Sequence, residues 1–146
     1  MDDPKRLDSI IKLAEQKKLD AGVDLVSARN QQSLELQQLE QLQAFYDEYC
    51  QRFEQATSVG MNARQLNDYR TFLQNLEGAI QQKSHQLMEA DTNVDERRHE
   101  WVDKHLRSEN LANFSDQLSR QKLIKNNRRE QKEADDRPLS KPPYPS

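Results

Sequence analysis

The sequence predicts an all-α protein, in which two long helices form an antiparallel coiled-coil hairpin that is followed by a disordered C-terminal tail. Only 34% of its 146 residues are hydrophobic and 32% are charged, a composition too polar for a thick globular core. Apolar residues nevertheless recur every three or four positions, as in coiled-coil helices. The chain holds three glycines and five prolines, and four of the prolines lie beyond Arg137, so few residues interrupt this pattern.

The first helix is expected at about 5–56. Pro4 follows two aspartates, which suits a helix start because proline has no N–H to lose in the first turn. A coiled-coil helix buries one stripe of side chains, its seam, against a partner helix. The predicted seam is Leu7, Ile11, Ala14, Ala21, Leu25, Ala28, Leu36, Leu39, Leu42, Tyr46, Tyr49, Phe53 and Ala56, with Lys18 and Gln32 at its two polar positions.

A turn is predicted at about 57–62 and a second helix at about 63–124. Gly60 can adopt the positive φ that ends a helix, and Asn62 can cap the next helix, with Gln65 completing a capping box. The second seam comprises Leu66, Tyr69, Leu73, Leu76, Ile80, Lys83, Leu87, Ala90, Val94, Arg97, Trp101 and His105. Two helices joined by a short turn run antiparallel, so residues 1–124 form the hairpin. Residues 125–146, which are polar and end in a proline cluster, are predicted to be a frayed helical end and then a disordered tail.

Nothing in the sequence predicts an enzyme, a cofactor or a metal site. The spacing of His85, His99 and His105 does not match a zinc-binding helix, and no nucleophile–base pair or phosphate loop is visible. A net charge of -3 argues against nucleic-acid binding. No apolar run is long enough to span a membrane and no signal peptide is visible, so we expect a cytoplasmic protein.

The informative feature is excess apolar surface near the turn. If the hairpin folds about the turn, facing residues have numbers that sum to roughly 121. That pairing brings together, on one face, Gln38, Leu42, Phe45, Tyr49, Phe72, Leu76, Ala79 and Lys83. These residues either thicken the core or pack on a third helix, or they form an exposed patch that binds a partner, with Gln38 and Lys83 as its polar rim.

Several segments resemble one protein family in order and spacing. The run from Gly60 to Gln82 reads GMNARQLNDYRTFLQNLEGAIQQ and is similar to the central segment of the flagellar export FliJ family. The segments Tyr46–Tyr49 (YDEY), Trp101–Lys104 (WVDK) and Asn127–Lys132 (NRREQK) resemble the same family. The resemblance covers most of residues 7–135. Phe45 and Lys83 depart from it, since Tyr and His are the residues expected there.

The resemblance implies a two-helix stalk, similar to the central stalk of rotary ATPases, in the flagellar type III export apparatus. Its implied partners are the export ATPase hexamer, the cytoplasmic domain of the export gate and the export chaperones. The gate-binding surface carries over to the eight residues of the patch. The ATPase contact is implied at the open end, near 1–25 and 105–130. The implied location is the cytoplasmic side of the inner membrane at the flagellar base, reached through these partners, with a role in flagellum biogenesis, motility and chemotaxis. A holdase chaperone and a plain structural coiled coil remain the alternatives.

Overall fold

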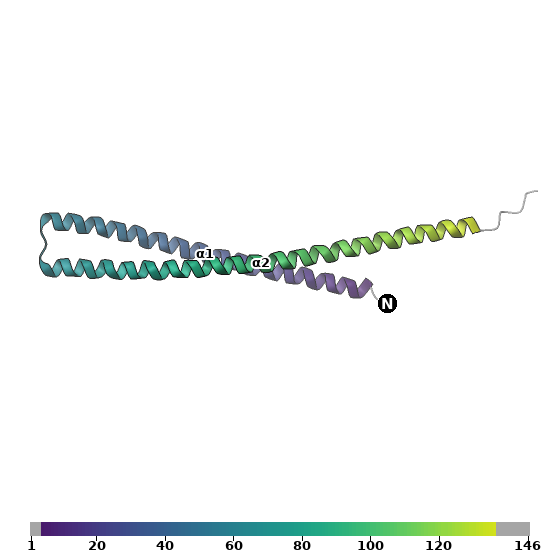
Figure 1. Cartoon of the computed structure of the whole chain (residues 1–146), viewed down its shortest axis with the longest axis horizontal. Helices are drawn as coiled ribbons and strands as arrows, with labels where there is room; N and C mark the ends of the chain where they lie inside the picture. Colours follow the sequence, from purple (N-terminus) through teal and green to yellow (C-terminus); the bar gives the residue numbers. More distant parts are fainter. Residues whose placement is uncertain (1–3, 137–146) are drawn as a thin grey trace, which may run out of the picture.

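The computed structural model describes residues 4–136, and these form two helices. Helix α1 runs from Pro4 to Val59 and helix α2 from Ala63 to Asp136. Figure 1 shows the two helices leaving the turn side by side, crossing near the middle and running on, with α2 extending beyond the start of α1. The all-α antiparallel hairpin predicted from the sequence is confirmed. The predicted disordered tail, residues 137–146, lies outside the described residues.

The turn is shorter than predicted but uses the expected residues. Only residues 60–62 separate the helices, and Gly60 has a φ of 108°. The side-chain Oδ1 of Asn62 accepts a hydrogen bond from the Gln65 N–H at 2.8 Å, and the Gln65 side chain accepts one from the Asn62 N–H at 3.4 Å. This reciprocal pair is the predicted capping box, and it satisfies N–H groups that the first turn of α2 would leave unpaired.

The tightest packing lies in the middle of the hairpin. The buried hydrophobic residues among those described are Ala14, Ala21, Leu25, Ala28 and Leu39 of α1 and Ala90 and Val94 of α2. Most of these side chains are small, which lets the two helices approach closely. Trp101 packs against the cluster of Leu25, Ala28 and Val94, and its indole ring lies over Gly22, where an added Cβ would sit 3.5 Å away.

One seam position was predicted incorrectly. Glu35 is 9% exposed whereas Leu36 is 45% exposed, so the seam passes through the charged residue and not through the leucine. An unbroken alternation of three- and four-residue steps leads from Gln32 to Glu35 and then to Leu39, whereas Leu36 fits the seam only by its apolar side chain. Helical geometry decides which side chain faces the partner. Every predicted seam residue of the second helix is buried or half-buried, as expected.

Helix α2 continues beyond position 124, into the segment that the sequence predicted to be a frayed helical end. It is helical through Asp136, and every residue from 116 to 136 is exposed. The facing level of Pro4, the first described residue of α1, is near position 117 of α2, so α1 cannot cover the later residues of α2. We call residues 118–136 the overhang. A lone helix of this length is marginal in water.

Substitution of Leu25 should destabilise the hairpin far more than substitution of another leucine on the same helix. Leu25 is 7% exposed and Leu19 is 62% exposed. Leu25→Ala is expected to lower the free energy of unfolding by roughly 2–5 kcal/mol, and Leu19→Ala by less than about 0.5 kcal/mol. Urea unfolding followed by circular dichroism measures both. Equal losses would contradict this seam.

Amide hydrogen exchange should divide α2 into two parts. Amides around Val94 are expected to exchange slowly because opening them requires breaking the buried seam. Amides of the overhang should exchange at least about a hundredfold faster, since a lone helix opens at little cost. Exchange measured by mass spectrometry or NMR tests this difference. Uniform protection along α2 would show that the overhang has a partner in the free protein.

Candidate protein-binding surface

An aromatic cluster lies on the surface near the turn. The ring centroids of Phe45 and Tyr49 are 4.8 Å apart, and those of Tyr49 and Phe72 are 4.6 Å apart. Both interplanar angles are near 50°, so the rings pack in the tilted arrangement that aromatic pairs favour. Phe45 is 43% exposed and Phe72 is 38% exposed. The half-buried Tyr49 thus joins two phenylalanines, one from each helix, into a single apolar surface.

The heptad positions explain why the predicted patch lies on one side of the hairpin. With the seam residues of each helix labelled a and d, all eight predicted patch residues fall at d or g. In an antiparallel pair, the g positions of both helices flank the same side of the seam. The contact of Tyr49 with Phe72 and the hydrogen bond from Lys83 to Gln38 show the predicted level matching. We call this side the d/g side.

The eight predicted residues differ in how accessible they are. Phe45 and Phe72 are exposed, and the other six are half-buried: Gln38, Leu42, Tyr49, Leu76, Ala79 and Lys83. Direct contact of Phe45 with Leu76, and of Leu42 with Ala79, stays a prediction. The exposed apolar surface of the patch is therefore concentrated on two side chains.

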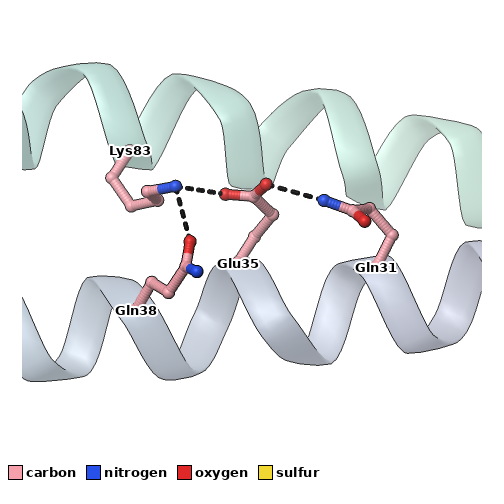
Figure 2. Close-up of polar contacts among 4 residues, drawn as sticks. All are labelled: Gln31, Glu35, Gln38 and Lys83. Carbon is pink, nitrogen blue, oxygen red and sulfur yellow. Dashed lines mark hydrogen bonds and ion pairs between the residues drawn. The ribbon is translucent and has the colours of Figure 1, made fainter.

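Lys83 and Gln38, the predicted polar rim of the patch, are joined by a hydrogen bond across the seam. Figure 2 shows the Lys83 ammonium pointing across the seam to α1. Its Nζ donates to Glu35 Oε2 at 2.9 Å and to Gln38 Oε1 at 2.7 Å, and Gln31 Nε2 donates to the second oxygen of Glu35 at 2.8 Å. The side chains of Lys83 and Glu35 are only 20% and 11% exposed. These four residues form a polar layer inside the hairpin, adjoining the apolar patch.

Comparison with protein-family profiles matches residues 4–140 to the family described as Flagellar FliJ protein. The chain belongs to the FliJ family. No curated protein matches the chain in a search of individual sequences. Membership assigns this FliJ-family protein a role in flagellar protein export, as the resemblance implied.

Other contacts of the FliJ-family hairpin were not anticipated from its sequence. On the opposite side of the seam, the Tyr46 hydroxyl donates to Glu77 Oε1 at 2.6 Å. This hydrogen bond is the main reason that the pKa of Tyr46 lies well above its usual value. Arg52 places its guanidinium 5.3 Å from the centroid of the Tyr49 ring, within the range of a cation–π contact. The sequence alone does not predict these two pairs, because tyrosine, glutamate and arginine side chains can each bond to many kinds of neighbour.

Two kinds of site were sought in the described part of this FliJ-family chain, and neither is found there. Within residues 4–136, no group of three His, Cys, Asp or Glu side chains is placed to hold a metal ion. Neither α1 nor α2 is long and apolar enough at any point to cross a membrane.

The polar layer should make the stability of this FliJ-family hairpin depend on pH. The hydrogen bond from Lys83 lowers the pKa of Glu35 below its ordinary value of 4.5. Because the folded-state pKa is depressed, the stabilisation is fully present above pH 4.5 and is lost as the pH falls through the lower folded value.

We therefore expect Glu35→Gln to melt a few degrees below the wild type at pH 7, with the gap closing as the pH falls below about 4.5. Thermal melts of both proteins across this range measure the effect. A gap that stays the same at every pH would mean that the carboxylate charge contributes nothing.

Proposed function

We propose that this protein is a stalk-like component of the flagellar type III export apparatus that binds the cytoplasmic domain of the export gate through the d/g side near the turn. The observation that carries the proposal is the exposure of Phe45 and Phe72 on either side of Tyr49. The family's gate-binding residues correspond to this same set of positions.

The physical properties of the cluster suit a binding site. Aromatic side chains dominate the affinity of many protein interfaces because each buries a large apolar area at a low cost in side-chain entropy. The two phenylalanines are held on a coiled coil, and their neighbour Tyr49 is half-buried, so little ordering is needed on binding. Because Lys83 and Gln38 already bond within the hairpin, the proposed contact is mainly apolar.

The remaining partners belong to the same proposal. The export ATPase hexamer would receive the open end of the hairpin, near 1–25 and 105–130, as the stalk of a rotary ATPase enters its ring. Export chaperones would bind the same protein, which would pass them on to the other parts of the export apparatus. The protein would act on the cytoplasmic side of the membrane, near the flagellar base, and would carry out no catalytic step itself.

A double substitution in the aromatic cluster tests the gate contact. Phe45→Ala/Phe72→Ala is expected to weaken binding to the cytoplasmic domain of the export gate by about 10- to 100-fold, because both side chains would be buried in the complex. Isothermal titration calorimetry measures the affinity, and circular dichroism checks that helicity is retained. The matched control is Leu34→Ala/Leu36→Ala, which removes two leucines that are each 45% exposed and lie off the d/g side.

Equal weakening by both double variants would show that the d/g side is not the gate site. Absence of gate binding by the wild type would overturn the proposal. In that case, suppression of aggregation of unrelated proteins would favour a holdase, and a mass that rises with concentration would favour a structural coiled coil.

A further inference from the structure

A second apolar surface lies at the open end of the hairpin, far from the aromatic cluster. Here the start of α1 and the facing part of α2 enclose a groove of about 730 Å³. Five apolar side chains line it: Pro4, Leu7 and Ile10 from α1, and Phe114 and Leu118 from α2. Ile10, Phe114 and Leu118 are 40%, 50% and 41% exposed. Large apolar residues that two packed helices leave exposed in a concave site are typical of a docking surface.

The edge of this groove carries three cationic side chains and one carboxylate, that of Asp8. Lys122 and Lys125 line it next to Leu118, and Arg6 lies on the α1 side. The two lysines begin a longer row, because the seam positions of α2 after Leu118 are Lys122, Lys125, Arg129 and Lys132. Residues 118–132 hold six basic residues and one acidic residue, and three further acidic residues, Glu133, Asp135 and Asp136, end the overhang. The face that α2 uses to contact α1 therefore becomes positively charged where α1 no longer covers it.

We infer that this groove binds an amphipathic helix of a partner protein, whose apolar stripe is flanked by carboxylates. A helix with its side chains is about 10 Å wide and can lay an apolar stripe into a groove between two other helices. Its carboxylates would pair with Lys122, Lys125 and Arg6, and the overhang would extend the contact along the row of cations. Ion pairs of this kind determine orientation and partner choice.

The charges and the shape of the site argue against two other occupants. A second copy of the chain would bring cations against cations if the two overhangs paired in parallel, and like charges at coiled-coil seam positions repel. A helix that binds an anionic membrane presents its apolar residues along an exposed, convex face. Here the apolar side chains lie inside a groove between α1 and α2.

The inference is tested with synthetic helices and the full-length chain. The probe is a fluorescein-labelled peptide of about three heptads, with leucine at its a and d positions and glutamate at its e and g positions. The control probe has lysine in place of every glutamate. Fluorescence anisotropy is expected to show binding of the acidic probe at least about tenfold tighter than that of the basic probe, with the difference shrinking as salt is added.

Matched variants then locate the site. Leu118→Ser, in the groove, should weaken binding of the acidic probe about tenfold or more, since it removes a buried anchor. Leu123→Ser should change it little, because Leu123 is 61% exposed and lies off the groove. Lys122→Glu/Lys125→Glu should abolish binding, whereas Arg120→Glu/Arg128→Glu, with the same change in net charge, should weaken it far less.

Equal binding of the two probes, or equal effects of Leu118→Ser and Leu123→Ser, would overturn the inference. It would also be overturned if the mass of the chain doubled with concentration while no peptide bound. Binding to phosphatidylglycerol vesicles but to neither peptide would overturn it as well. The groove and the aromatic cluster lie at opposite ends of the hairpin. Failure of the gate contact would therefore leave the groove standing, whereas the groove lies within the open end that is proposed to enter the ATPase ring.

Discussion

The structure depends on the burial of one narrow stripe of side chains by each helix. Only α1 and α2 contact each other in the described part of the chain, and no large side chain there is fully buried. Each pair of facing seam residues therefore contributes a small part of the stability of the hairpin. The contribution is greatest where buried Ala, Leu and Val residues let the two helices approach each other closely. Because water reaches every position away from the seam, surfaces able to bind partners lie along the edges of that seam.

A polar layer separates the buried middle of the hairpin from the aromatic cluster. Lys83 meets Glu35 and Gln38 across the helices, and Gln32 donates to Asp91 at 2.7 Å one heptad away. Paired polar residues in a seam add less stability than apolar ones but specify the alignment of the helices. A slip of one heptad would place the Lys83 ammonium against Ala28 or Leu42, and the Glu35 carboxylate would keep only its hydrogen bond from Gln31. The layer thus favours the same register that the short turn at Gly60 imposes.

Large apolar residues are exposed on several faces of the hairpin, and two groups of them lie next to the seam. The aromatic cluster and the groove at the open end both use d and g positions, so both lie along one side. The other side carries polar pairs such as Tyr46 with Glu77. A rigid hairpin with two apolar sites along one side can connect two protein partners that are separated by most of its length, which suits a role in an export assembly. The overhang, where the seam positions are basic, distinguishes the open end from the turn.

The sequence by itself determined the fold class, the turn and capping box, and the matching of levels, because these depend on local spacing and on the short connection between the helices. It also placed the patch residues on one side, since d and g positions are a property of helical periodicity. Only the tertiary structure decided that Glu35 replaces Leu36 in the seam, that Lys83 bonds to Glu35 and Gln38 across it, and that α2 stays helical through Asp136. The physical reason is that an amino-acid type does not fix what its side chain faces. A lysine can be exposed or can reach across to a carboxylate, and the two helices together decide which.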